Sequence, residues 1–464
     1  MRYGDDAPIA ARATPLAESA LSLVRVSGKK SIELVSRIFS RPKKLLAAGG
    51  NTILHGWIVE KDTPDKKIDE VLVCVYREPE SYTGEDGLDI CCHGGIAVSR
   101  DVLAALFSVG FREALRGEFT FRAFINGKLD LTRAESVMEI VSAKSGEARG
   151  RAVKRLSGVL ENEIKNINKL ILGVLAETEL LLDYSEIDGI GDENSRLPGG
   201  DDLAQAKKRL SALRETYRAE KLYRDGALVV FAGCPNAGKS SLFNLLLKEE
   251  RSIVTEVPGT TRDYIEAWIT IKDIPICLAD TAGLCDSNDT VEKIGVMRSK
   301  NLLETADLVL YVIDGEAGLC GQDSNFFINN KSPGQPFIVI WNKCDIAGCT
   351  IKDSAMLGLD SVISVSAKTG EGIIELMDNI ADCLTKNLTV TETAAALGSE
   401  RQKQLVDNAL KSLESVYAME NENQPLDLIA PVLREAVNSL GEITGEVSTQ
   451  NILETMFSKF CVGK

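Results

Sequence analysis

The chain has 464 residues, 44% of them hydrophobic and 26% charged, which is enough for two to four domains that each bury a core. Lysine and arginine number 53 and aspartate and glutamate 68, so the net charge is −15. This charge argues against broad contact between the chain alone and a nucleic-acid backbone, and a partner should supply much of the basic surface if the substrate is RNA.

Cysteine usage and hydropathy indicate the cellular setting. The 11 cysteines contain no C-x-x-C pair and there are only two histidines, His55 and His93, so a zinc site is not expected. The opening MRYGDDAPIA lacks the apolar core of a signal peptide. The sequence contains no run of about 18 apolar residues, so we expect no membrane span. We therefore expect a protein of the reducing cytoplasm.

The N-terminal segment, residues 1–127, has a mixed pattern. Apolar runs such as Leu21–Val26 and Val71–Tyr76 are typical of strands, and glycine-containing turns separate them. The pattern predicts a compact α+β domain.

Two helical segments flank a segment of a different kind. Residues 128–222 and 388–464 repeat apolar side chains every three or four positions, as amphipathic helices do, and a Gly/Asp-rich break runs from Asp188 to Asp202. Residues 223–387 alternate short apolar runs with helical stretches, which predicts an α/β domain with a largely parallel sheet. The runs expected as buried strands are Leu228–Phe231, Leu308–Ile313, Phe337–Trp341 and Val362–Val365. The simplest organisation is an α/β domain inserted between two halves of one helical domain.

A phosphate-binding loop opens the α/β segment. The stretch GCPNAGKS, Gly233–Ser240, fits G-x-x-x-x-G-K-[ST] between an expected strand and an expected helix, Ser241–Leu247. Backbone N–H groups of such loops surround phosphates at the N-terminus of the helix. Lys239 should reach the β- and γ-phosphates, and Ser240 should ligate Mg²⁺.

Three further motifs indicate that the nucleotide is GTP. In DTAG, Asp280–Gly283, the aspartate can hold the Mg²⁺ shell and the glycine can donate to the γ-phosphate. In NKCD, Asn342–Asp345, the aspartate can accept hydrogen bonds from guanine N1–H and the 2-amino group, two donors that adenine lacks. In SAK, Ser366–Lys368, a backbone N–H can meet the guanine oxygen. Four motifs in this order predict a GTPase.

The residue after DTAG poses a catalytic problem. It is Leu284, which cannot orient a water molecule as the glutamine of Ras-like GTPases does. Hydrolysis therefore needs another water-orienting group and another positive charge. The amide oxygen of Asn236 and the oxygen-rich segment Thr255–Asp263 could cage a monovalent cation. Glu292 could orient the water, although by pattern alone it is more often a solvated helix-capping residue.

The chain ends in FCVGK, which places Cys461 four residues from the terminus. Read as C-a-a-X the ending would be a prenylation signal, but Gly463 is not aliphatic and Lys464 is not a usual final residue. A reactive thiol and a packing role are the alternatives, and a reactive thiol needs a cationic neighbour.

Taken together, the motifs resemble the MnmE (TrmE) family of tRNA-modification GTPases over nearly the whole chain. The resemblance rests on the nucleotide motifs and on LVRVSG (23–28), SYTGED (81–86), HGG (93–95), GEFTFRAFINGKLDLTRAE (117–135), LGEITGE (440–446) and FCVGK. It implies an N-terminal tetrahydrofolate-binding-like α+β domain that dimerises, a helical domain, and an inserted Ras-like G domain.

The resemblance also implies roles for individual residues of the G domain. The expected nucleotide contacts are Asn236, Ala237, Gly238, Lys239, Ser240, Ser241, Thr255, Glu256, Val257, Pro258, Gly259, Thr260, Thr261, Asp280, Thr281, Ala282, Gly283, Asn342, Lys343, Asp345, Ser366, Ala367 and Lys368. K⁺ would be held by Asn236, Thr255, Val257 and Thr260, and Mg²⁺ by Ser240 and Thr261. Glu292 and Lys239 would be the catalytic residues, with Glu292 orienting the water.

Family members act with MnmG, an FAD protein, so the resemblance implies a homodimer that joins an MnmG-like partner in a heterotetramer. The complex would add an aminomethyl or carboxymethylaminomethyl group to carbon 5 of the wobble uridine of certain tRNAs. The one-carbon unit would come from a 5,10-methylene- or 5-formyl-tetrahydrofolate.

The implied folate contacts are Arg25, Asp89, Lys128 and Lys464, with Cys461 as a further functional tail residue. Three features depart from the family pattern: Asp89 replaces the usual glutamate, Arg116 replaces the usual proline, and PLAESALSL (15–23) is not glycine-rich.

Two other functions fit parts of the sequence. A ribosome-assembly GTPase would share the phosphate loop and PGTTRD, but it would need a basic RNA-binding domain. A folate-binding scaffold would use its G domain only as a switch and would leave GTP unchanged.

Overall fold

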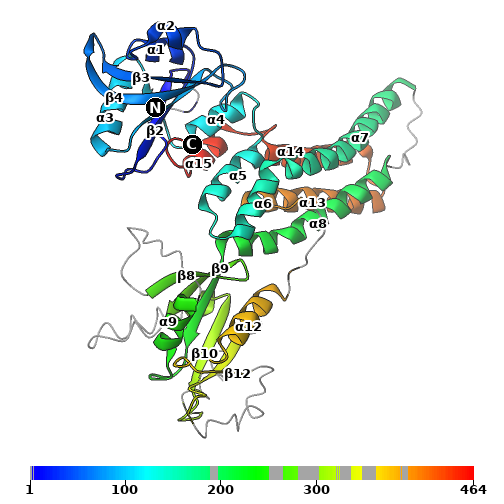
Figure 1. The fold of residues 1–464 in the computed structure, drawn as a ribbon. Helices are drawn as coiled ribbons and strands as arrows, with labels where there is room; N and C mark the ends of the chain where they lie inside the picture. Colours follow the sequence, from blue (N-terminus) through cyan, green and yellow to red (C-terminus); the bar gives the residue numbers. More distant parts are fainter. Residues whose placement is uncertain are drawn as a thin grey trace, which may run out of the picture. The chain divides into compact units, whose positions relative to one another are not determined.

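The computed structural model describes residues 3, 5–188, 197–249, 265–280, 302–319, 321, 323, 336–346, 362–386, 388 and 395–464. The chain forms two compact units, each assembled from separate stretches of sequence (Figure 1). The first unit comprises Met1–Met138, Leu156–Lys207 and Gln404–Lys464, and the second comprises Glu139–Arg155 and Lys208–Lys403. These units are defined by which residues pack together, so their boundaries differ from the four predicted domain ranges, which stay a prediction.

A six-stranded sheet forms the N-terminal part of the first unit, in the order β3-β4-β5-β2-β1-β6 (Figure 1). Its strands are β1 (Ile9–Arg12), β2 (Leu21–Ser27), β3 (Thr52–Glu60), β4 (Thr63–Tyr76), β5 (Gly87–His93) and β6 (Arg112–Glu113). Neighbouring strands are antiparallel except β1 and β6, which are parallel. The two apolar runs predicted as strands are confirmed, as parts of β2 and β4.

Alternation of side chains along β2 separates a core from a polar face. Val24 and Val26 are buried against helices on one face of the sheet, because successive side chains point to opposite faces. Those helices are α1 (Ser31–Ser36), α2 (Pro42–Leu46) and α3 (Ile96–Ser108). Arg25, between the two valines, pairs in register with Asp89 of β5. The sheet therefore places these two charged residues together on the face opposite the core.

Longer helices follow the sheet. They are α4 (Glu118–Ile125), α5 (Leu131–Ser142), α6 (Gly146–Leu156), α7 (Val159–Asp188), α8 (Gly200–Asp225), α13 (Glu400–Asn421), α14 (Leu426–Thr444) and α15 (Gln450–Phe457). A stripe on α7 with steps of four and three residues is buried, at Leu160, Ile164, Ile167, Ile171 and Val174. Helices α7 and α14 pack together. The apolar residues continue at helical spacing from Leu156 into α7, which would predict one continuous helix. The helix is instead interrupted, because Gly158 has φ 89° and separates α6 from α7.

Buried ion pairs hold α5, α6 and α8 together within the second unit. The guanidinium of Arg155 is 5% exposed and contacts the carboxylates of Glu139, at 2.5 Å, and Glu220. Arg151 adds a second ion pair to Glu220 at 2.6 Å. Removing one partner of such a buried pair leaves a charge without compensation, so this network resists separation of the three helices.

The second unit contains the α/β fold, with a six-stranded sheet in the order β12-β11-β10-β7-β9-β8. Its elements are β7 (Ala227–Ala232), α9 (Lys239–Glu249), β8 (Ile265–Ile271), β9 (Ile274–Asp280), β10 (Leu308–Asp314), β11 (Phe337–Asn342), β12 (Val362–Val365) and α12 (Ile373–Thr385). All pairs are parallel except β8 with β9. The four predicted buried strands and the largely parallel sheet are confirmed. Helices α9 and α12 share one core with one face of this sheet.

Within the described part of the chain, no helix combines the length and the hydropathy that crossing a membrane requires.

Candidate functional site

The phosphate loop leads from β7 into α9 along a path that needs glycine at two positions. Gly233 and Gly238 have φ values of 129° and 92°. A Cβ at these positions would lie 2.2 Å from the carbonyl oxygen of Val312 and 2.1 Å from Nδ2 of Asn342, respectively. Asn236 has φ 65°, in the left-handed region that asparagine adopts more readily than most residues. The motif glycines are therefore required because backbone approaches Gly233 closely and the buried Asn342 side chain approaches Gly238 closely.

Lys239 and Ser240 lie at the start of α9. The ammonium of Lys239 is buried and donates to the carbonyl oxygens of Gly233 and Cys234, at 2.9 Å each. Ser240 Oγ donates to Oδ2 of Asp280 at 2.9 Å, so the phosphate loop meets the first residue of the predicted DTAG motif. A hydroxyl and a carboxylate in contact supply the oxygen ligands that Mg²⁺ prefers. These two residues fit the described part of the predicted magnesium site.

A single buried amide joins three of the nucleotide motifs. Asn342 is 1% exposed and its Nδ2 donates to the carbonyl oxygen of Ala237 at 2.8 Å. Its Oδ1 accepts a hydrogen bond from the backbone N–H of Ala367 at 3.0 Å. Both ends of the amide are therefore used, and the phosphate loop is tied to the NKCD and SAK motifs. The sequence predicts a nucleotide contact for each of the three motifs, and this side chain connects them.

The expected base-recognition residue, Asp345, is fixed by its neighbour. Ser366 Oγ donates to Oδ1 of Asp345 at 2.7 Å and accepts a hydrogen bond from the backbone N–H of Thr369 at 3.1 Å. The hydrogen bond from Ser366 lowers the pKa of Asp345, so the carboxylate is ionised and can act as an acceptor at neutral pH. Ser366 itself is fully buried.

Asp314 is a residue of this site that sequence analysis missed. It ends β10 and accepts a hydrogen bond from the ammonium of Lys343 at 2.6 Å, where Lys343 has φ 66°. Burial alone would raise the pKa of Asp314, but hydrogen bonds from Lys343 and the backbone lower it overall. The usable signal was an aspartate directly after the predicted strand Leu308–Ile313, because ligands collect at the carboxyl ends of parallel strands.

The remaining predicted nucleotide contacts divide into two groups. Asn236, Ser241 and Lys368 are exposed at the motifs to which they belong. The others lie outside the described residues, namely Thr255, Glu256, Val257, Pro258, Gly259, Thr260, Thr261, Thr281, Ala282, Gly283 and Glu292. Asn236 is thus the one member of the predicted K⁺ set that the structure describes.

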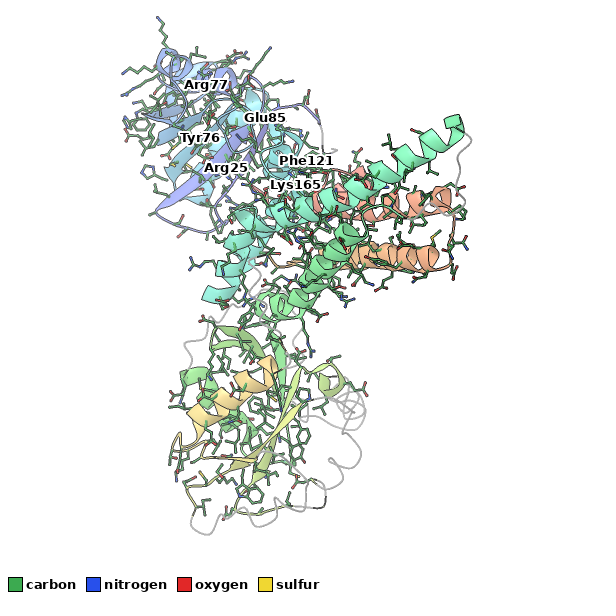
Figure 2. The ribbon with its side chains drawn as sticks, turned by 90° about the vertical axis from the view of Figure 1, so that its right-hand side faces the viewer. Arg25, Tyr76, Arg77, Glu85, Phe121 and Lys165 are labelled. Carbon is green, nitrogen blue, oxygen red and sulfur yellow. The ribbon has the colours of Figure 1, made fainter. Side chains whose placement is uncertain are left out.

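A second polar site lies on the open face of the N-terminal sheet. Arg25 Nε donates to Oδ1 of Asp89 at 2.8 Å, and a terminal nitrogen donates to Oδ2 at 3.1 Å. Burial would lower the pKa of Arg25, but the hydrogen bonds with Asp89 raise it overall. Tyr76 and Tyr82, which sequence analysis missed, are close enough to affect this charge. Figure 2 labels Arg25 and Tyr76 on this part of the molecule. Tyr76 could have been found from the pattern of β4. Cys74 pairs with Asp89 across the two strands, and Tyr76, two residues later, points to the same face.

The C-terminal tail reaches this second site. The carbonyl oxygen of Gly463 accepts a hydrogen bond from Arg25 at 3.4 Å, and that of Cys461 accepts one from the backbone N–H of Gly117 at 3.2 Å. The Cys461 residue is exposed, and the backbone N–H of Lys464 donates to its carbonyl oxygen. Lys128 Nζ donates to the carbonyl oxygen of Pro79 at 3.0 Å. The structure thus brings together Arg25, Asp89 and the tail. Arg25 and Gly463 are 438 residues apart in the sequence.

Comparison with known proteins covers both units. The family model described as the MnmE helical domain matches residues 131–461, and the one described as the GTP-binding protein TrmE N-terminus matches residues 8–128. A protein of Treponema denticola named tRNA modification GTPase MnmE is 44% identical over 475 residues, which is 100% of this chain and 99% of that protein. Proteins of the same name from Borreliella afzelii and Treponema pallidum are 40% and 38% identical over 464 and 503 residues. These alignments cover 99% and 100% of this chain and 98% and 99% of the relatives.

Proposed function

The chain belongs to the MnmE family of tRNA modification GTPases, and we propose that it hydrolyses GTP to drive the modification of the wobble uridine of certain tRNAs. The observation that carries the GTPase part is the buried amide of Asn342. It holds the phosphate loop, through Ala237, and the base-recognition loop, through Ala367, in one fixed arrangement. A nucleotide must be bound at both its base and its triphosphate before its γ-phosphate is positioned for attack.

Guanine would be selected by Asp345. Its carboxylate, oriented by Ser366, would accept hydrogen bonds from N1–H and the 2-amino group of the base. Adenine offers neither donor there, so ATP would leave the carboxylate without a partner. The backbone N–H of Ala367 is already committed to Asn342, which fixes the loop that would face the guanine oxygen.

The triphosphate would lie along the N-terminus of α9. Lys239 would neutralise the β- and γ-phosphates, and the loop N–H groups would bind their oxygens. Mg²⁺ would be held by Ser240 and Thr261, with Asp280 behind Ser240, and when bound it supplies positive charge to the γ-phosphate.

Two features would supply the water-orienting group and the positive charge that Leu284 leaves missing. We assign K⁺ to a site formed by Asn236, Thr255, Val257 and Thr260, completed when two G domains associate. Glu292 would orient the attacking water, because Leu284 cannot. The support for this part is the family membership and the place of Asn236 in the phosphate loop, where it has a left-handed backbone conformation and is exposed.

The first unit would supply the one-carbon chemistry. The Arg25–Asp89 pair presents donors and acceptors side by side, which suits the polar edge of a pterin ring, and Lys128, Lys464 and Cys461 would complete the site. The N-terminal part would be a folate-binding-like domain that dimerises, and the G domain an insertion in the helical domain. An MnmG-like FAD protein would join the dimer and bring the tRNA.

Steady-state GTP hydrolysis in KCl and in NaCl at equal ionic strength tests this proposal. We expect turnover in K⁺ to exceed that in Na⁺ by about tenfold or more, since a positive charge at this position stabilises the transition state strongly. Asn236→Ala should remove the difference between the salts. Gly150→Ala, a change in α6 with open space around the added methyl group, is the control and should keep it.

Equal and slow rates in both salts would remove the K⁺ mechanism. Unchanged GTP after long incubation, with intact nucleotide binding, would instead favour a folate-binding scaffold whose G domain only switches.

A further inference from the structure

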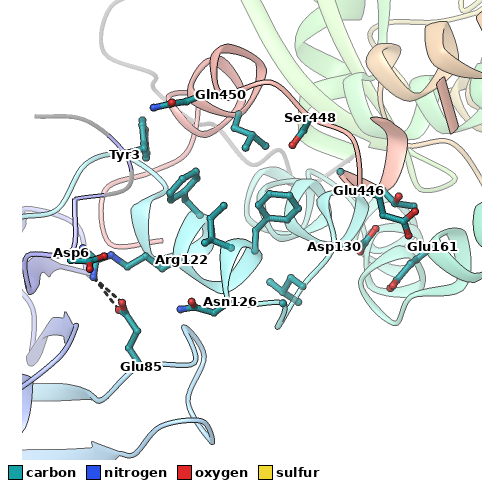
Figure 3. Close-up of a pocket in the computed structure, with 18 of the residues that line it drawn as sticks. Tyr3, Asp6, Glu85, Arg122, Asn126, Asp130, Glu161, Glu446, Ser448 and Gln450 are labelled. Carbon is teal, nitrogen blue, oxygen red and sulfur yellow. Dashed lines mark hydrogen bonds and ion pairs between the residues drawn. The ribbon is translucent and has the colours of Figure 1, made fainter. Parts of the chain in front are cut away.

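A pocket of about 950 Å³ lies within the first unit (Figure 3). Its volume is near the upper end of the range typical of binding sites. Five stretches of chain enclose it: the N-terminal residues, Glu85 in the loop before β5, α4 with the loop that follows it, the beginning of α7, and the segment from Thr444 to Leu453. None of the residues that line it belongs to the nucleotide motifs, and neither Arg25 nor Asp89 lines it.

The floor of the pocket is apolar and rigid. It is formed by Phe121, Phe124, Ile125, Leu129 and Leu453. The ring of Phe121 packs edge-on against Phe457 at 5.5 Å between centroids, inside a buried cluster, so this floor is held from behind. Ile125 is 59% exposed above it. An exposed isoleucine beside the buried ring of Phe121 and the half-buried ring of Phe124 is a place where a partner's apolar side chain would lose water contact favourably.

The rim of the pocket is acidic. The lining includes six carboxylates, Asp5, Asp6, Glu85, Asp130, Glu161 and Glu446, and only two basic groups, Arg122 and Lys165.

Both basic groups are engaged with carboxylates of the same wall. Arg122 pairs with Glu85 at 3.0 Å (Figure 3), and Lys165 pairs with Glu161 at 2.7 Å. In the view of Figure 3, Asp6 and Glu446 lie on opposite sides of the floor, and both are exposed. A negative rim around an apolar floor attracts a positively charged, partly apolar ligand.

We propose that this pocket is the docking site for a basic segment of the protein partner, which inserts an apolar side chain over Ile125 and places flanking lysine or arginine side chains against the carboxylate rim. The identity of that partner as an MnmG-like flavoprotein rests on the proposed function. RNA does not fit this surface, because its phosphates would face the carboxylates. A small inorganic cation would leave the apolar floor unused.

The test is the affinity between the full-length chain and the purified flavoprotein from the same organism, measured by biolayer interferometry at 50 and 200 mM KCl. Two variants alter the pocket, Ile125→Ser at the floor and Glu446→Lys at the rim. The matched control is Ile53→Ser on β3, an isoleucine that is 65% exposed and does not line the pocket. We expect Kd to rise about tenfold or more in each pocket variant and less than about twofold in the control. Glu446→Lys should also make Kd less sensitive to salt.

GTP hydrolysis by each variant checks that the chain is folded, because none of these positions lies in the nucleotide site. If the wild-type chain binds the flavoprotein and both pocket variants bind it equally well, the inference is wrong and the proposed partnership stands. If the wild-type chain does not bind the flavoprotein, both the inference and the proposed partnership are wrong. Two results would also overturn the inference by assigning the pocket to another occupant: a selective loss of tRNA binding, or a change in oligomeric state by light scattering.

Discussion

The choice of base at the nucleotide site depends on one carboxylate, that of Asp345. Asp345→Asn keeps the size of the side chain but replaces one acceptor oxygen with an NH₂ donor, which would face the 2-amino group of guanine. We expect GTP affinity to fall by at least about a hundredfold, because a site built for hydrogen bonds rejects a mismatched donor strongly. Xanthosine triphosphate carries a carbonyl oxygen in place of that amine, so its affinity should rise. Calorimetric titration with both nucleotides measures the switch.

The control for this substitution is Asp378→Asn on α12, whose carboxylate pairs with Lys272 at 2.8 Å on the surface. It should leave both affinities unchanged. A loss of equal size for the two nucleotides in Asp345→Asn would contradict a role in base selection and indicate a damaged loop.

Burial separates the reactivity of two thiols. Burial raises the pKa of Cys92 on β5 to about 11, and the nearby Asp69 adds to the effect. At pH 8 about one in a thousand of these thiols is ionised, and raising the pH to 10 increases that fraction about a hundredfold. Cys461 is exposed. We expect iodoacetamide at pH 8 to label Cys461 and to leave Cys92 unlabelled, as measured by peptide mass spectrometry.

Cys461→Ser should remove the fast-reacting thiol and leave Cys92 protected. Labelling of Cys92 at the rate of Cys461 would show that β5 opens in solution.

At the scale of elements, regular patterns were predictable and chain reversals were not. The parallel strands of the second unit are continuous apolar runs because both faces of their sheet are covered, and this signal is local. The strand β6 has only two residues, Arg112 and Glu113, and exists because it pairs with β1 about a hundred residues away. The break between α6 and α7 at Gly158 was hidden because the apolar period continues across it.

The site shows the same limit. The phosphate loop and the guanine motifs are short stretches whose spacing carries their chemistry, so the sequence alone predicts their residues. The contact of Arg25 with the Gly463 carbonyl depends on tertiary packing and left no local pattern. The position of Asp314 after a strand was visible in the sequence, but its pairing with Lys343 was not. The same applies to the acidic pocket, whose walls come from five separate stretches of chain.

The segment after α15 is anchored by the buried aromatic side chain of Phe460 as well as by hydrogen bonds from Gly117 and Arg25. Phe460 is 3% exposed and its ring lies 5.2 Å from that of Phe457, in a cluster shared by α4, α5 and α15. We expect Phe460→Ala to cost about 3 kcal/mol of stability, as large-to-small changes in cores do, and to release the tail from Arg25. Calorimetry should show a lower first transition, and hydrogen exchange should show faster exchange at the Lys464 amide.

Lys459→Ala is the control, because Lys459 is exposed beside the same segment. It should change neither measurement. An unchanged exchange rate in Phe460→Ala would mean that the Gly117 and Arg25 hydrogen bonds hold the tail without the ring.

The whole molecule carries a net charge of −15, which bears on how a tRNA modification enzyme meets its substrate. Phosphate contacts by lysine and arginine supply most of the nonspecific affinity for nucleic acid, and each one steepens the dependence on salt. We expect the chain alone to bind tRNA weakly, with a Kd of about 10 μM or more at 150 mM KCl and a shallow salt dependence. Adding the flavoprotein should lower Kd and steepen that dependence, because the partner would contribute the cationic surface.

Fluorescence anisotropy of labelled tRNA at 50 and 200 mM KCl, with and without the partner, measures both quantities. A tRNA without uridine at the wobble position is the control, and it should show the same salt slope because phosphate contacts do not read sequence. Nanomolar binding by the chain alone with a steep slope would contradict the expectation. It would require a basic surface concentrated enough to outweigh the net charge, and the acidic pocket would then have to lie away from the bound RNA.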